Sequence, residues 1–237
     1  SLKKMGNDST PVTPNSPSAV PSKPAPKPKN DPSSHEYRTC KLPENKAPQN
    51  TRRDVYSHTP YQPSEKSTYQ ISYLGVHAGT GTVYVDPPIL VDKLWHQVIR
   101  AEAKSGDWYK YVYLVKDKLV ATSRPWDSGI RRFFMEQDEG ALFGKHYVAT
   151  KWVDFNHANC TVTEKLKEKK DSEKIRNFEL HRGGSDVLSA IFNLRKRNLR
   201  IGRVETMPIY TSEKNWLLEA HIIAEEQVSV PAGKFLA

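Results

Sequence analysis

The chain has 237 residues and a formal net charge of +9. Residues 1–68 hold 12 of the 17 prolines and a net charge of +5, from 11 basic and 6 acidic residues, so residues 69–237 carry only +4. Because the positive charge is not gathered on the foldable part, the composition argues against a nucleic-acid-binding protein, and no apolar run reaches the roughly 20 residues of a membrane-spanning helix.

Residues 1–68 are predicted to form a disordered tail rich in proline, lysine and serine, and residues 69–237 a single folded domain. In segment 9–32, proline alternates with small polar residues and lysine, which offer a core nothing to bury. We therefore expect an extended spacer. It serves as a linker, as a tether that holds the domain away from a membrane or wall, or as a ligand for a proline-binding groove.

The tail also bears on the compartment. Segment Ser1–Met5 carries lysines with no apolar stretch behind them, so no signal peptide is visible. Proline-rich leaders are common just after a removed secretion signal, which favours a periplasmic or otherwise exported protein. The two cysteines are Cys40 in the tail and Cys160 in the domain, and the sequence leaves open whether they pair or remain free thiols.

From Tyr69 onward, apolar and polar residues alternate over short segments with turn residues between them, the pattern of half-buried strands. In segment 107–115 this places Tyr109, Tyr111 and Tyr113 on one face. The spacing predicts a mainly β domain: a single curved antiparallel sheet that forms a closed or partly open, barrel-like fold. The predicted strands are 69–73, 75–85, 95–103, 107–115, 119–123, 131–137, 145–155, 161–167, 174–181, 204–210, 215–225 and 227–230.

Segment 161–180 predicts a hairpin, because two alternating arms flank the charged tip Glu168–Glu173. Charges on edge strands block pairing with other sheets. A basic contact to phosphate or to an anionic lipid head is the alternative, and the mixture of lysine with glutamate argues against it.

One segment, 187–195, predicts a short α-helix with its apolar residues on one stripe. Ser185 or Asp186 in front of it is a suitable N-cap, and acidic charge suits that end of a helix. Asn198 and Gly202 can end it. A single helix among about ten strands would lie on one mouth or face of the curved sheet.

Three motifs follow one another in the domain: YQISYLGVHAG at 69–79, SDVLSAIFNLR at 185–195 and VSVPAGKF at 228–235. In this order they resemble the bacterial domain of unknown function family 3108, and the resemblance covers residues 69–237. The structural positions of the motifs are Gly75, Gly79, Asp186, Ser189 and Gly233.

The resemblance implies an exported envelope protein that has a signal peptide or a lipoprotein anchor. The family has no assigned activity, so no catalytic residue is carried over. Its pattern continues beyond the third motif with further strands, so the resemblance also implies a domain that is truncated at its C-terminal end, Ala237.

Asp154, His157 and Cys160 are zinc ligands by residue type, and His146 or His181 could complete a set of four. A hairpin turn supported by Asn and Asp explains the same segment. Cys160 as a nucleophile with His157 as its base is also conceivable, but nothing nearby lowers the pKa of the thiol. We therefore expect no metal site.

The glycines Gly75, Gly79 and Gly81 match a phosphate-binding loop only in number, because strands flank them and no helix follows. Hairpin turns that need positive φ explain them instead. We therefore expect no cofactor.

The candidate ligand-binding residues are Tyr109, Tyr111, Tyr113, Trp126 and Arg195. Aromatic side chains fill cores and cross-strand pairs, but they also line cavities for apolar or glycan ligands. Arg195 either pairs with an acid or a carbonyl at the end of the helix or reaches the anionic head of a ligand.

These features predict a non-catalytic envelope protein that binds or carries an amphiphile such as a lipid or an envelope glycan. The alternative is a scaffold or adaptor that binds a protein partner through its sheet surface, and a hydrolase or metal enzyme is the least supported. Peripheral association with a membrane is compatible with the sequence. A nucleic-acid partner is not expected.

Overall fold

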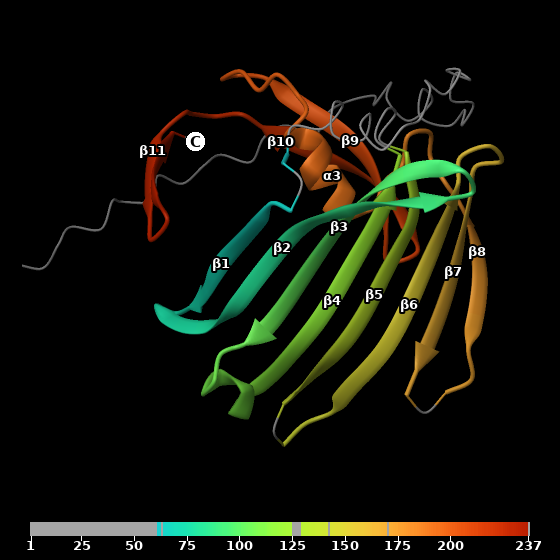
Figure 1. Ribbon diagram of the computed structural model, residues 1–237. Coiled ribbons are helices and arrows are strands. Elements are labelled where there is room, and N and C mark those ends of the chain that lie inside the picture. The colour runs from blue at the N-terminus through green and yellow to red at the C-terminus, as the bar shows by residue number, and fades with distance from the viewer. Residues whose placement is uncertain (1–60, 63, 125–128, 142, 170, 237) are drawn as a thin grey trace, which may run out of the picture. The chain divides into compact units, whose positions relative to one another are not determined.

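The computed structural model describes residues 61–62, 64–124, 129–141, 143–169 and 171–236, all within one unit of the chain, Ser33–Ala237. Its main element is a sheet of eight antiparallel strands arranged in chain order (Figure 1). The mainly β domain with a large antiparallel sheet is confirmed. The strands of this sheet are β1 (Lys66–Tyr73), β2 (Val76–Val91), β3 (Leu94–Ser105), β4 (Tyr113–Ser123), β5 (Ile130–Ala141), β6 (His146–Asn156), β7 (Thr161–Glu168) and β8 (Lys174–Glu179).

The prediction of a single sheet is wrong, because four further strands form two separate hairpins. These are β9 (Val204–Thr211) with β10 (Lys214–His221), and β11 (Gln227–Val230) with β12 (Gly233–Leu236). Ser185 forms a parallel bridge with Ile209, which directs β9 over a face of the large sheet instead of along its edge. The strands β1 and β8 are the two edges of that sheet, so the described strands do not close into a barrel.

The strand predicted at 107–115 is also wrong. A short 3-10 helix, η1 (Tyr109–Tyr111), interrupts it, and β4 then runs without a break through residues 116–118, which separate the predicted strands 107–115 and 119–123. The hydroxyl of Ser105 explains this connection: it donates to the carbonyl of Tyr113 and accepts from the amide of Val115, both at 2.7 Å. The three tyrosines of the segment therefore do not share one strand face.

The glycines follow the predicted turns only in part. Gly75 has a φ of +78° in the β1–β2 turn, and Gly233, the first residue of β12 after the β11–β12 turn, has a φ of +137°. Gly79 lies inside β2 at a φ that other residues adopt. A Cβ there would stand 2.5 Å from the carbonyl oxygen of Lys104, so close approach of two strands, not turn geometry, explains Gly79.

The helix α3 (Val187–Leu194) starts where the sequence predicts. The amide of Ser189 donates to Oδ1 of Asp186 at 3.0 Å, which makes Asp186 the N-cap. Ser189 and Phe192 are among its buried residues. Helix α3 contacts β3, β4 and β9 and so lies against one face of the large sheet.

We call the face against α3 and β9 the covered face; Ile99, Ala121 and Val153 belong to it. The register alternates these residues with those of the opposite, open face, which include Arg100, Val120 and Trp152. The largest apolar cluster joins the covered face to Leu180 and to Tyr210 of β9.

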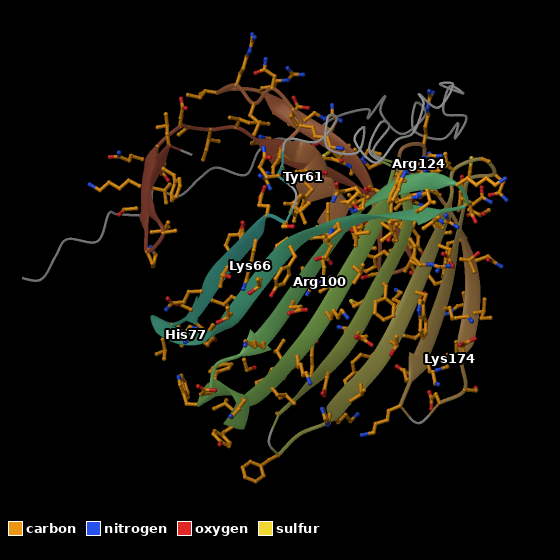
Figure 2. The ribbon with its side chains drawn as sticks, viewed as in Figure 1. Tyr61, Lys66, His77, Arg100, Arg124 and Lys174 are labelled. Atoms are coloured by element: carbon orange, nitrogen blue, oxygen red, sulfur yellow. The ribbon has the colours of Figure 1, made fainter. Side chains whose placement is uncertain are left out.

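A second cluster packs Tyr61, which is labelled in Figure 2, against Phe192, and the two rings lie 5.1 Å apart and edge to face. The folded part therefore includes Tyr61 and Glu65, which lie before the predicted boundary at residue 69. The remainder of the predicted tail, residues 1–60, lies outside the described residues. Among the helices in the described part of the chain, none is long and apolar enough to cross a bilayer.

Candidate functional site

A pocket of about 310 Å³ lies between the covered face, α3 and β9. Pockets that bind small ligands start at about this size. The sheet supplies its floor, α3 one wall and the end of β9 another. Its lining residues are Leu119, Phe133, Met135, Lys151, Val153, Phe155, Glu164, Asp186, Val187, Leu188, Ile191, Tyr210, Thr211 and Ser212.

The strand register assembles the floor of the pocket. Leu119 lies opposite Met135, which lies opposite Lys151, so three neighbouring strands contribute one cross-strand row. Because side chains alternate between the faces, the next covered-face row adds Phe133 and Val153. The floor is therefore apolar over most of its area.

The wall formed by α3 contains apolar side chains that are not buried in the core. Val187 and Ile191 are 40% and 53% exposed, although both belong to the apolar stripe of the helix. They line the pocket together with the half-buried Leu188. The stripe predicted to face a core therefore faces this pocket in part.

A buried ion pair provides the polar part of the lining. Nζ of Lys151 lies 2.9 Å from Oε1 of Glu164, and only 17% and 5% of the two side chains are exposed. Burial raises the pKa of Tyr210, and the neighbouring Glu164 carboxylate raises it further, so its hydroxyl stays protonated. Charged and hydroxyl groups thus meet an otherwise apolar surface.

Asp186 also lines the pocket while it caps α3. Burial raises the pKa of this carboxyl, and the cap hydrogen bond to Ser189 opposes the shift. The same residue therefore fixes the beginning of the helix and adds an acidic group to the pocket wall.

The sequence contains one signal for this site that the prediction missed. In β7, Val162, Glu164 and Leu166 occupy alternate positions, so Glu164 stands where the alternation places an apolar residue. A charged residue at a buried position of a strand needs a partner of opposite charge, and Lys151 on the neighbouring strand is that partner. The role of Tyr210 depends on β9 crossing the sheet, for which the sequence has no local signal.

The predicted ligand-binding residues lie elsewhere. Tyr109 and Tyr111 belong to η1, and the hydroxyl of Tyr113 donates to Oε2 of Glu139 at 3.2 Å. Trp126 lies outside the described residues. None of the described members lines the pocket. Ligand binding through them stays a prediction.

Arg195 has the structural role that was considered for it. Its Nη1 and Nη2 donate to the two carboxylate oxygens of Glu65 at 2.8 and 3.3 Å. The guanidinium carbon also lies 5.4 Å from the ring centre of Tyr61 and 5.3 Å from that of Phe192. Arg195 thus ties the C-terminal end of α3 to the segment before β1.

Outside the pocket, β4 carries a further polar group. Asp117 of β4 accepts from the amide of Asp138 at 3.2 Å. Burial and the neighbouring Glu139 raise the pKa of Asp117 to about 6, from an ordinary value of 3.8. A carboxyl group with a second carboxyl group nearby keeps its proton to a higher pH than an isolated one, because two negative charges so close repel each other.

The zinc candidates have other partners. Asp154 pairs with Arg132 at 2.6 Å, and Nε2 of His157 donates to the carbonyl of Ile130 at 2.8 Å. Cys160 is disulfide-bonded, and Cys40, the other cysteine, lies outside the described residues. No three His, Cys, Asp or Glu side chains within the described ranges are grouped so that they could hold a metal ion.

Comparison with known proteins identifies a family. The family described as "Protein of unknown function (DUF3108)" matches residues 68–237. No curated protein and no solved structure matches the chain significantly.

Proposed function

The chain belongs to the DUF3108 family, and from this membership and the geometry of the pocket we propose that it is a non-catalytic envelope protein that binds a small amphiphile. The main support for this proposal is the pocket, whose apolar lining adjoins the buried Lys151–Glu164 pair. An apolar chain fits along Phe133 and Met135, and a polar head fits at the ion pair.

The compartment is part of this proposal. A disulfide persists in the periplasm and outside the cell, whereas thiols in the cytosol are kept reduced. The disulfide at Cys160 therefore supports an exported protein, in agreement with the proline-rich composition before residue 69. The open eight-stranded sheet would act there as a partly open, barrel-like wall for the ligand.

Ligand binding is tested by filling the pocket. We choose Met135→Trp, because Met135 lies on the floor and a larger ring there displaces ligand volume. The probe is N-phenyl-1-naphthylamine, whose fluorescence rises in apolar surroundings, with dodecylphosphocholine as competitor. We expect the variant to bind the probe about tenfold or more weakly, the loss of about two buried CH₂ contacts.

Ile175→Trp is the matched control, since Ile175 is 58% exposed on β8 and does not line the pocket. The control should bind the probe like the wild type. Equal binding by all three proteins, or no competition by dodecylphosphocholine, would contradict the proposal. Native mass spectrometry of protein purified without detergent should also show a co-purified amphiphile.

A scaffold role is favoured by a different observation, an exposed apolar row on the edge strand β1. Tyr69, Ile71 and Tyr73 are 57%, 45% and 61% exposed, and no described strand pairs with the outer edge of β1. A partner that adds a strand there would slow hydrogen exchange of the outer β1 amides. Exchange that is unchanged by envelope extract would count against this role.

A further inference from the structure

The open face of the sheet carries a groove that runs across the strands. One hollow of about 710 Å³ extends over β1 to β6, and a second of about 350 Å³ extends over β5 to β7. Both include Glu136, Val148 and Thr150, so the two hollows are continuous. We call them together the transverse groove; with strands 4.7–4.9 Å apart, it spans roughly 28 Å from β1 to β7.

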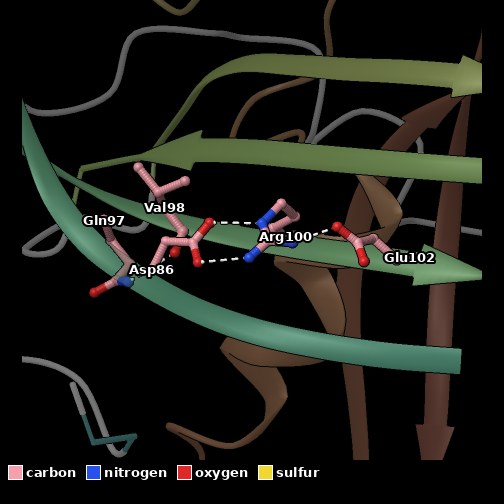
Figure 3. A network of polar contacts seen from close by, with 5 residues as sticks. All are labelled: Asp86, Gln97, Val98, Arg100 and Glu102. Atoms are coloured by element: carbon pink, nitrogen blue, oxygen red, sulfur yellow. Dashed lines mark hydrogen bonds and ion pairs between the residues drawn. The ribbon is translucent and has the colours of Figure 1, made fainter. Parts of the chain in front are cut away.

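The acidic side chains of the groove are mostly occupied. Arg100, which also pairs with Asp86, binds the Glu102 carboxylate (Figure 3), and Nε2 of His146 contacts Asp138. Glu168 lies 3.5 Å from Nζ of Lys174. The lining acids with no ion pair among the described residues are Glu136 and Asp117, and Asp117 accepts a hydrogen bond from the amide of Asp138.

The lysines of the groove have no such partners. Six of them line the two hollows, and none of the six forms an ion pair with a described residue. Six uncompensated positive charges against the carboxyl groups of Glu136 and Asp117 leave the groove ready for anionic groups. The six are Lys66, Lys104, Lys116, Lys118, Lys167 and Lys169.

Two of these lysines oppose each other directly. The antiparallel register pairs Lys104 of β3 with Lys116 of β4 on the open face. Like charges in directly opposed positions destabilise a sheet. A bound anion between them removes that repulsion, so this pair marks a preferred position for a negative group.

The other groove residues fit a chain rich in hydroxyl groups. Threonine hydroxyls both donate and accept hydrogen bonds, and the Glu136 carboxylate accepts them, as sugar hydroxyls require. The rings of Tyr84, Phe134 and Trp152 offer flat apolar surfaces in the same groove. The guanidinium carbon of Arg100 lies 3.9 Å from the ring centre of Tyr84 and anchors that ring. The threonines are Thr68, Thr80, Thr82 and Thr150.

We propose that the transverse groove binds an anionic glycan, laid across the strands with a carboxylate or phosphate group between Lys104 and Lys116. This site lies on the face opposite the amphiphile pocket and shares no lining residue with it. The binding test of the transverse groove can therefore fail while that of the amphiphile pocket succeeds, and the reverse.

The experiment is calorimetric titration with oligogalacturonate, with maltohexaose as the neutral glycan and oligo-deoxythymidylate as a polyanion without the sugar hydroxyl pattern. We expect the wild type to bind oligogalacturonate, with affinity that falls as salt is added. Lys104→Thr with Lys116→Thr should weaken binding about tenfold or more, the loss of at least one charge-assisted hydrogen bond. Trp152→Leu should weaken it independently.

The control is Lys214→Thr with Lys234→Thr, which removes the same charge from exposed strands outside the groove. Since the Lys104–Lys116 repulsion disappears, the first double variant should unfold at the same or a higher temperature than the wild type. Absence of saturable binding to oligogalacturonate, equal weakening in both double variants, or preference for oligo-deoxythymidylate would each overturn the proposal.

Discussion

At the scale of single residues, Asp186 combines two opposing effects on stability. Its carboxylate caps α3, but it is buried, and burial disfavours its charged form. Folding therefore gains a cap hydrogen bond while it loses hydration of a charge. The two effects separate when the acceptor oxygen is kept and the charge is removed.

Asp186→Asn should leave the protein at least as stable as the wild type at pH 7, because asparagine keeps the cap without a charge. Asp186→Ala should lower the free energy of unfolding by about 1 kcal/mol, the usual cost of a lost cap. Urea unfolding followed by circular dichroism measures both. Equal stability of the two variants would show that the cap contributes nothing.

Asp117 should make stability depend on pH. Its pKa of about 6 in the folded protein lies above the ordinary 3.8, so the folded state binds more protons than the unfolded state between these values. Stability then falls as pH rises through that window. Asp117→Asn should flatten this dependence and stabilise the protein at pH 7 by roughly 1 kcal/mol or less, because the site is partly open to solvent.

The measurement is urea unfolding at several values from pH 4 to pH 7. Asp107→Asn is the control, since the Asp107 side chain is fully exposed and lies 4.0 Å from Lys110. The control should keep the pH dependence of the wild type. If the wild type became more stable from pH 4 to pH 6 and Asp117→Asn removed that gain, the raised pKa of Asp117 would be refuted.

At the scale of elements, α3 depends on a segment before the first predicted strand. Tyr61 is 3% exposed and packs on Phe192, and Glu65 binds Arg195. Burial raises the pKa of Tyr61 to about 12, so its hydroxyl is neutral at all physiological pH values. The segment acts as part of the domain although its composition resembles the tail.

Tyr61→Ala should therefore destabilise the protein by about 3 kcal/mol, in the range for large core side chains. Tyr69→Ala, at a position that is 57% exposed, should cost less than about 1 kcal/mol. Thermal unfolding of the two variants beside the wild type makes the comparison. A small effect at Tyr61 would place the start of the folded domain after it.

The elements also show how far the sequence could predict the fold. Alternation located most strands, and the Asp186 cap located α3, because both signals are local. The β3–β4 connection was misjudged, because its geometry depends on the hydroxyl of Ser105. Most of the pocket was missed, since it depends on where β9 lies, a contact between segments distant in sequence.

At the scale of the whole molecule, the structure has no free cysteine among its described residues. Maleimide labelling of the denatured, unreduced protein should therefore add no label, and reduction should allow two, one for each cysteine of the sequence. Intact mass spectrometry reads both states. Labelling before reduction of protein secreted into the periplasm would contradict the disulfide at Cys160.

The attachment of α3 at both ends bears on how fast a ligand can enter and leave. One end is held by the buried bridge between Ser185 and Ile209, and the other by the partly exposed Arg195–Glu65 pair. The exposed attachment is the weaker one in water and is screened by salt. Exchange through that end would be gated by its opening, so residence time in the pocket would shorten as ionic strength rises.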